Sequence, residues 1–416
     1  MSVSQNFPDE GPSLSLNFAG AEKLDSRITF TRSSSGTYLD RNGLVVTAPA
    51  NSPRFEHSYN GSNVESLGLL IEESRTNLVT YSEQFDNAVW SKVNAGITTN
   101  TSATTAPDGS NNADLLLPNT TNAQHRLDQS PTSSTTTQVF SVYAKSGGYN
   151  FVGLRIGSIG SSFDLSTGEV SSSSAGSVGS IQNVGNGWYR CSIVVSGALS
   201  NDISRINVTT AVSPSSSFAG DGTSGIYIWG AQLEAGAFPT SYIPTVASTV
   251  TRSADNASMT GTNFSSWYNS TASTGGTILV QARRGYSGNF SGYPNLYTIS
   301  DGTSNNSYIA YGVDASTQFT NYAINTSGVL QTDYVFGTLS TTNLFKSIHS
   351  FATNSSTFCV NGSLTTTDTS VTLPTVTRLN IGQTNTVGSN LWNGTISSLS
   401  YYPTRLTNSQ LQNLTK

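Results

Sequence analysis

The chain has 416 residues, only 10% of them charged, and a formal net charge of −5 at pH 7. Because an average soluble protein has about 25% charged residues, hydroxyl and amide groups supply most of this chain's polarity. Lys and Arg form no cluster of the kind that binds nucleic acid, and no apolar run approaches a membrane span. We therefore expect no nucleic-acid partner, no membrane partner, and two to four domains.

The N-terminal region, residues 1–78, combines short strand-like segments with loops. Apolar and polar residues alternate in 13–18 and again in 28–32, which predicts strands with one buried face. Asn42-Gly43, in front of a Val-rich run, is a strong local signal of a β-hairpin. Since the region has few apolar residues, we expect it to dock on a partner or on another copy of the chain.

Residues 65–78 form a dense apolar run beside a cluster of charges. They read Glu-Ser-Leu-Gly-Leu-Leu-Ile-Glu-Glu-Ser-Arg-Thr-Asn-Leu, and Tyr-Ser-Glu-Gln-Phe follows at 81–85. In the rest of the chain, apolar and charged residues are spread among many Ser, Thr, Asn and Gly residues. We interpret this stretch as the junction between an attachment segment and the modules that it carries.

Residues 79–246 predict a first β-sandwich, because strand-like runs alternate with Gly, Ser and Asn turns. Trp188 and Trp229 lie inside such runs, which favours core packing. The clearest strand candidates are 114–117, 138–145, 151–156, 187–195 and 225–234.

Three aspartates of this sandwich, Asp108, Asp114 and Asp221, lie in loops or at strand ends. Oxygen ligands from separate segments can hold a structural calcium ion. The alternative is that they form turns, as Asp108-Gly109 and Asp221-Gly222 suggest, and this interpretation is favoured. No other cofactor is expected.

Residues 247–275 are interpreted as a linker, and residues 276–416 as a second β-sandwich. Asn361-Gly362 predicts a hairpin turn, and the run 392–402 predicts a long final strand. Thr407 and Gln410 have the spacing of a capping box, which predicts a short closing helix. The fold class is thus all-β: two β-sandwich domains after a short β-rich N-terminal region.

The residues of common catalytic and metal sites are missing or scattered. His57, His125 and His349 fall in three separate regions, and Cys191 and Cys359 lie in strand-like runs that favour burial. Glycoside hydrolysis needs only two carboxylates, so this alternative stays open, but residues 276–416 contain no Glu. We expect the protein not to be an enzyme.

Sugar binding needs an aromatic face for the pyranose ring and polar groups for its hydroxyls. Tyr286 and Tyr293 lie in a loop where aromatic residues alternate with small polar ones, and Trp392 opens the final strand beside Asn393-Gly394. We take these three as the carbohydrate-binding candidates. The alternative is that the loop's aromatic residues pack back onto the sandwich.

Several of these stretches together resemble a known class of proteins. Leu-Gly-Leu-Leu-Ile-Glu-Glu at 67–73, Arg-Thr-Asn-Leu at 75–78 and Tyr-Ser-Glu-Gln-Phe at 81–85 are similar to the N-terminal regions of phage virion proteins such as tail fibres. Residues 79–246 resemble jelly rolls similar to carbohydrate-binding modules, through Asn-Gly-Trp-Tyr-Arg at 186–190 and Trp-Gly-Ala-Gln-Leu-Glu at 229–234. Residues 276–416 resemble concanavalin-like and laminin-G-like lectin sandwiches.

The resemblance implies a phage tail fibre or similar appendage, made in the host cytoplasm and carried on the virion, that binds host surface glycan. It also implies that residues 1–78 contact other virion proteins and that the chain is a homo-oligomer, with a trimer expected from fibres in general. The alternative is a purely structural virion protein, a capsid decoration or assembly component, that binds other virion proteins and no sugar.

Overall fold

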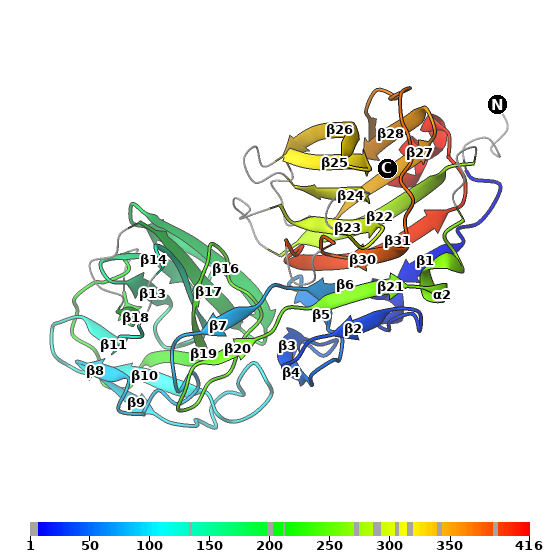
Figure 1. Ribbon diagram of the computed structural model, residues 1–416. Coiled ribbons are helices and arrows are strands. Elements are labelled where there is room, and N and C mark those ends of the chain that lie inside the picture. Colours follow the sequence, from blue (N-terminus) through cyan, green and yellow to red (C-terminus); the bar gives the residue numbers. More distant parts are fainter. Residues whose placement is uncertain are drawn as a thin grey trace.

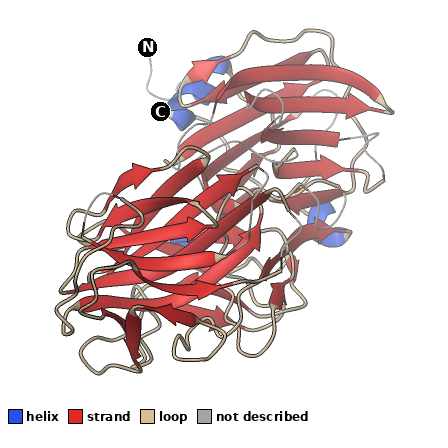
Figure 2. Cartoon of the chain, turned by 90° about the vertical axis from the view of Figure 1, so that its left-hand side faces the viewer, coloured by secondary structure: helices blue, strands red, loops and turns tan. Residues whose placement is uncertain are grey.

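The computed structural model describes residues 7–132, 135–197, 203–210, 213–269, 274–285, 293–303, 308–313, 319–338, 343–385 and 390–416. Two β-sandwiches account for nearly all of its regular structure (Figure 1), and the second view shows strands throughout both of them (Figure 2). The all-β fold class is confirmed. None of the helices in the described ranges is both long and apolar enough to span a membrane.

Sandwich A consists of two six-stranded antiparallel sheets. Its core contains residues that alternate along β12, such as Phe140, Val142 and Ala144, which are 0% exposed. Sheet I has the order β16 (Ser177–Gly185), β17 (Trp188–Ser196), β12 (Thr137–Gly147), β19 (Gly225–Ala235), β10 (Asp114–Pro118), β9 (Ala95–Thr98). Sheet II has the order β15 (Glu169–Ser173), β14 (Ile159–Asp164), β13 (Phe151–Ile156), β18 (Ser204–Thr209), β11 (His125–Gln129), β8 (Ser91–Val93).

Sandwich B packs an eight-stranded sheet III against a seven-stranded sheet IV. Sheet III has the order β29 (Ser363–Leu364), β28 (Ser355–Val360), β27 (Phe345–Ala352), β22 (Gly276–Arg284), β31 (Gly394–Tyr402), β6 (Val64–Ile71), β5 (Phe55–Tyr59), and β1 (Leu14–Asn17) also pairs with β31. Sheet IV has the order β2 (Thr29–Thr31), β21 (Asn256–Thr260), β30 (Arg378–Ile381), β23 (Asn295–Ser300), β24 (Tyr308–Val313), β25 (Phe319–Thr326), β26 (Val329–Thr338).

The structure gives residues 1–78 a different place from the separate region that we predicted. β31 pairs along one edge with β22, and along its other edge first with β6, through 394–396, and then with β1, through 398–401. β2 pairs with β21, which lies in the stretch interpreted as a linker. The physical reason is that these strands, each with one apolar face, complete their hydrogen bonding and burial on the sheets of sandwich B. Strand pairs so far apart in sequence leave no local signal.

Sandwich A is therefore inserted into sandwich B. The chain leaves sandwich B through β7 (Arg75–Asn77) and returns through β20 (Val250–Arg252), and these two strands pair antiparallel with Asn77 opposite Val250. Both crossing strands lie side by side between the two sandwiches (Figure 1).

A hairpin from the N-terminal region covers the outer face of sheet I. β3 (Gly36–Leu39) pairs with β4 (Val45–Ala48), and its Leu39 and Val45 join an apolar cluster with Trp188 and Trp229. Both tryptophans are buried, as predicted, but under this hairpin and not between the two sheets of sandwich A.

Several local predictions are confirmed. Gly43 has a φ of 74° in the β3–β4 turn, and Asn361 and Gly362 both have positive φ in the β28–β29 turn, which is the conformation that Asn-Gly favours. The closing helix α3 (Asn408–Thr415) starts from a Thr407–Gln410 capping box. The other two helices, α1 (Phe18–Ala21) and α2 (Thr262–Ser265), are single turns.

Candidate binding site between the two sandwiches

A buried cluster of charges fixes the junction of the two sandwiches. Arg54 donates from Nη1 to Glu72 Oε2 at 2.7 Å and from Nη2 to Asp255 Oδ2 at 2.5 Å. Arg32 donates to Asp255 Oδ1 at 3.1 Å, and Arg252 lies 3.5 Å from Glu72. Buried charges are tolerated only when they are paired and hydrogen-bonded. Burial by itself would raise the pKa of Glu72, but Arg252 and Arg54 hold it at about 2.

The same cluster binds the segment that closes sandwich A. Glu72 accepts hydrogen bonds from the backbone N–H of Ser241 at 2.8 Å and from its hydroxyl at 2.7 Å. Arg54 also donates to Ser241 Oγ at 2.6 Å, and Thr37 of the hairpin donates to the carbonyl of Tyr242. Because charge-assisted and neutral hydrogen bonds both cross the junction, they hold sandwich A in one orientation on sandwich B.

A cavity of about 480 Å³ lies beside this junction. One wall is the outer face of β16 and β17 in sheet I, and the other consists of β5, β6 and the end of β22 in sandwich B. The closing segment 237–242 lines it as well. Ligand sites commonly have volumes of about 300 to 1,000 Å³ and occur at domain interfaces, so this cleft is the candidate binding site.

The wall on sheet I presents a graded row of side chains to the cleft. In the antiparallel register of β16 and β17, Val178 lies opposite Val194, Ser180 opposite Ser192, and Gln182 opposite Arg190. All six line the cavity. Since residues two apart in a strand face the same side, the wall passes from an aliphatic pair through a hydroxyl pair to an amide and a guanidinium.

Two carboxyl groups, Glu56 and Glu72, also line the cleft. Burial raises the pKa of Glu56 to about 7, against the hydrogen bonds that it accepts from the backbone N–H groups of Leu39 and His57. A pair of carboxyl groups with pKa values displaced in opposite directions is typical of glycosidases. However, Glu72 is only 6% exposed, and both of its oxygens already accept hydrogen bonds from Ser241 and Arg54. We therefore assign Glu72 a structural role.

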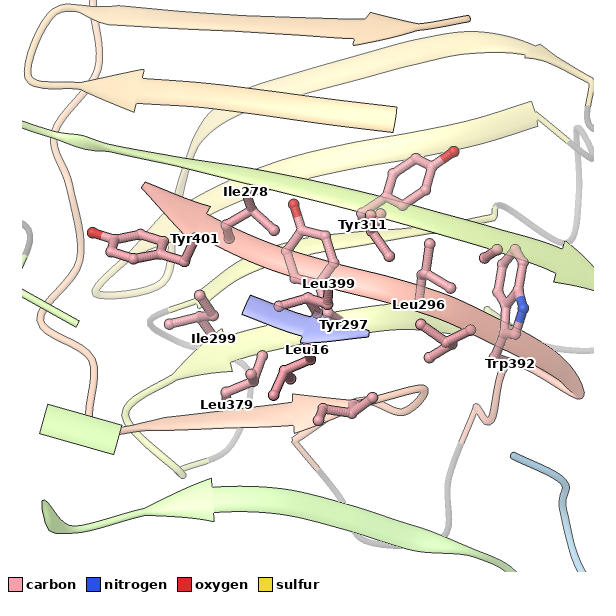
Figure 3. Close-up of a cluster of buried hydrophobic side chains, with 14 of the residues drawn as sticks. Leu16, Ile278, Leu296, Tyr297, Ile299, Tyr311, Leu379, Trp392, Leu399 and Tyr401 are labelled. Atoms are coloured by element: carbon pink, nitrogen blue, oxygen red, sulfur yellow. The ribbon is translucent and has the colours of Figure 1, made fainter. Parts of the chain in front are cut away.

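The three carbohydrate-binding candidates from the sequence have different outcomes. Tyr286 lies outside the described residues, and Tyr293 is 55% exposed, with its backbone N–H donating to Asn390 Oδ1 at 3.3 Å. Trp392 is 0% exposed, and its indole N–H donates to the carbonyl of Arg283 at 2.9 Å. Figure 3 shows Trp392 among the apolar side chains of sandwich B. Trp392 cannot present a face to a sugar, so this candidate was wrong: its ring packs in the hydrophobic core of sandwich B.

The three aspartates considered for calcium accept hydrogen bonds from backbone N–H groups. Asp108 accepts from the backbone N–H of Ser110, and Asp221 accepts from two backbone N–H groups of its turn. Asp114 is 2% exposed and accepts from two backbone N–H groups, while burial raises its pKa to about 6. The part of the chain that the structure describes holds no group of three acidic, His or Cys side chains that could bind a metal ion.

Sequence reasoning missed Arg190, Gln182 and the rest of the graded wall. Residues 187–195 were predicted as a strand, but nothing in a strand's sequence shows which part of the chain lies opposite its outer face. The base of the predicted aromatic loop reaches the site: Arg283, Arg284 and Gly285 line the cleft.

Neither a protein family nor a curated protein matches the chain. Among solved structures, the NanB sialidase of Streptococcus pneumoniae is 12% identical over 33% of this chain and 23% of its own, with a TM-score of 0.28. Domain 4 of the arabinanase AbnA of Geobacillus stearothermophilus, in complex with arabinotriose, is 13% identical over 44% and 84%, with a TM-score of 0.30.

Mouse laminin alpha1 domains LG4-5 are 11% identical over 70% of this chain and 88% of their own, with a TM-score of 0.25. The chain spans only 23% and 26% of the two NanB sialidase chains that it matches. Likenesses at these TM-scores carry no argument about what the chain binds, which must come from the cleft itself.

Proposed function

We propose that the protein is a non-enzymatic phage virion appendage that binds host surface glycan in the cleft between sandwiches A and B. The observation that carries glycan binding is the cleft's lining, which combines hydroxyls, amides, a guanidinium and the half-buried Tyr38 in 480 Å³. Such a mixture suits a pyranose, which has both apolar faces and hydroxyl groups. The assignment to a phage virion rests on the sequence resemblance.

Binding without catalysis is supported by the state of the carboxyl groups. Retaining and inverting glycosidases both need a second carboxylate that can reach the sugar or a water molecule. Glu72 is held by Arg54 and Ser241 inside the junction, so Glu56 has no accessible acidic partner among the described lining residues. Weak sites displayed in many copies on one particle would give tight attachment through avidity.

The first experiment is binding of the purified protein to intact host cells, with and without periodate oxidation of their surface sugars. We expect binding that oxidation abolishes. Ser180→Trp would place a large side chain in the cleft, since Ser180 is exposed on its wall, and should abolish binding. Ser102→Trp, at an exposed position away from the cleft lining, is the matched control. Binding unaffected by both oxidation and Ser180→Trp would contradict the proposal.

One observation favours the alternative of a purely structural virion protein. β26, the outermost strand of sheet IV, exposes Val329, Leu330 and Val335 by 51% to 60%. An exposed apolar edge strand is a surface on which another chain can add a strand. Under this alternative the folded protein would bind other virion proteins, and cells would not retain it.

A further inference from the structure

Arg190 stands out among the charged residues of the cleft, because each of its contacts in the described structure is with an uncharged group. Its Nη2 donates to the carbonyl of Thr240 at 2.7 Å and to Ser141 Oγ at 3.2 Å, and its guanidinium lies 5.5 Å from the centre of the Tyr143 ring. A guanidinium has five N–H donors. These bonds orient it through Nη2, and Nε is buried, so the two N–H groups of Nη1 are the donors left for a ligand.

Three other charged side chains of the lining, Glu56, Glu72 and Arg283, are compensated or reduced in charge. Glu72 is paired with Arg54 and Arg252, and Arg283 is paired with Glu65. Glu56, whose pKa burial raises to about 7, is about half uncharged at neutral pH. Within the described residues, no carboxylate pairs with Arg190. An anion that enters the cleft could therefore bind the Arg190 guanidinium without breaking an existing ion pair.

The side chains around Arg190 match the parts of an acidic sugar. Gln182, its cross-strand neighbour, adds an amide that can both donate and accept, and the pairs Ser180–Ser192 and Val178–Val194 follow along the same wall. A guanidinium binds a carboxylate with charge-assisted bonds, hydroxyls and an amide suit ring hydroxyls, and valines suit an apolar face. The dimensions of the cavity admit one or a few sugar residues.

We propose that the cleft selects glycans that carry a carboxylate, and that Arg190 binds this carboxylate with Gln182 beside it. This inference rests on the proposed glycan-binding function and names the chemical class of its ligand. A carboxylate-bearing sugar can be a sialic acid or a uronic acid, and the recognition chemistry is the same for both.

The test measures binding of the full chain to four probes by isothermal titration calorimetry. The acidic probes are sialyllactose and an oligogalacturonate, and the neutral probes are lactose and the carboxyl-reduced form of the same oligogalacturonate. We expect at least one acidic probe to bind about tenfold or more tightly than its neutral counterpart, the effect of one charge-assisted hydrogen bond. Preference for either acidic probe identifies which source supplies the carboxylate.

Two sets of variants test whether the preference for acidic probes depends on the wall formed by β16 and β17. Arg190→Gln should reduce affinity for the acidic probe about tenfold and leave affinity for the neutral probe unchanged. Because Arg190 also bonds to Thr240, a second pair avoids dependence on that contact: Val178 is 65% exposed, so Val178→Glu and Val178→Lys should both fold. Because both changes remove the same apolar side chain, their difference isolates charge, and we expect Val178→Glu to bind the acidic probe about threefold more weakly than Val178→Lys.

The outcomes separate this inference from the proposed function. Equal affinity for the acidic and neutral probes, with Ser180→Trp still abolishing it, would overturn the carboxylate preference and leave glycan binding in place. Binding of neither kind of probe, together with unchanged attachment to oxidised cells, would overturn both. Equal affinities of Val178→Glu and Val178→Lys for an acidic probe would also overturn the inference.

Discussion

Replacing Asp255 by Asn tests how the two sandwiches are held together. Asp255 is 0% exposed and accepts from Arg32 through Oδ1, and from Arg54 and the backbone N–H of Glu72 through Oδ2. Asp255→Asn keeps the shape of the side chain but removes its charge. Three buried guanidiniums, those of Arg32, Arg54 and Arg252, would then share one carboxylate.

We expect this change to reduce the free energy of unfolding by about 3 to 5 kcal/mol, since removing one partner leaves a buried charge uncompensated. The assay is urea unfolding followed by tryptophan fluorescence, with the transitions of the two sandwiches fitted separately. Asp25→Asn is the control, because Asp25 and Arg27 form a partly exposed pair that is worth at most about 1 kcal/mol. A loss for Asp255→Asn no larger than that of the control would refute the reasoning.

The remaining predictions concern single positions and use the same unfolding measurement. The folded-state pKa of Glu56, about 7, lies above its unfolded value of 4.5, so the stability of the wild-type protein should fall as pH rises from about 4.5 to about 7. Glu56→Gln should lose this pH dependence, and an unchanged pH profile in this variant would contradict the assignment. Trp392→Ala should cost about 3 to 5 kcal/mol, whereas Tyr293→Ala should change stability by less than about 0.5 kcal/mol; similar losses would show that the tryptophan is not buried as described. Gly236 has a φ of 131°, and a Cβ there would overlap the guanidinium of Arg75. Gly236→Ala should therefore reduce the free energy of unfolding by about 1 to 3 kcal/mol. No change in stability would mean that the Arg75 side chain moves freely.

The local elements were predictable because their causes are local. Asn-Gly favours left-handed backbone in hairpin turns, at Gly43 between β3 and β4 and at Asn361 and Gly362 between β28 and β29. Thr407 with Gln410 satisfies free N–H groups of a helix start. Each of these signals lies within a few residues, so the sequence displays it directly.

The division into domains could not be read in the same way. Leu14 pairs with Tyr401, and Ile71 pairs with Gly394, so the strands of residues 1–78 find their partners at the other end of the chain. Periodicity shows which face of a strand is buried but not against which strand. Residues 29–33 and 249–253 read Thr-Phe-Thr-Arg-Ser and Thr-Val-Thr-Arg-Ser. Each segment contributes an arginine, Arg32 or Arg252, to the buried cluster, which periodicity could not show.

The candidate site was predicted only at its edge. The sequence directed attention to aromatic residues near 286–293 and to Trp392, whereas the cleft depends on polar residues of β16 and β17 that look like ordinary outer-face positions. Arg190 lines a cleft only because the closing segment 237–242 and sandwich B lie around it. Neither of these is adjacent to Arg190 in the sequence.

The pairing of β31 with β1, β6 and β22 has a consequence for synthesis of the protein. On the ribosome, residues 75–252 emerge complete, with sandwich A and the β7–β20 pair that closes its insertion, before β31 exists. Sheet III must wait with β1 and β6 unpaired to β31 until residues 394–402 have left the exit tunnel. Contacts of such long sequence separation form slowly and expose strand edges meanwhile. Chains truncated before residue 394 should thus release a folded sandwich A attached to aggregation-prone remnants of sandwich B.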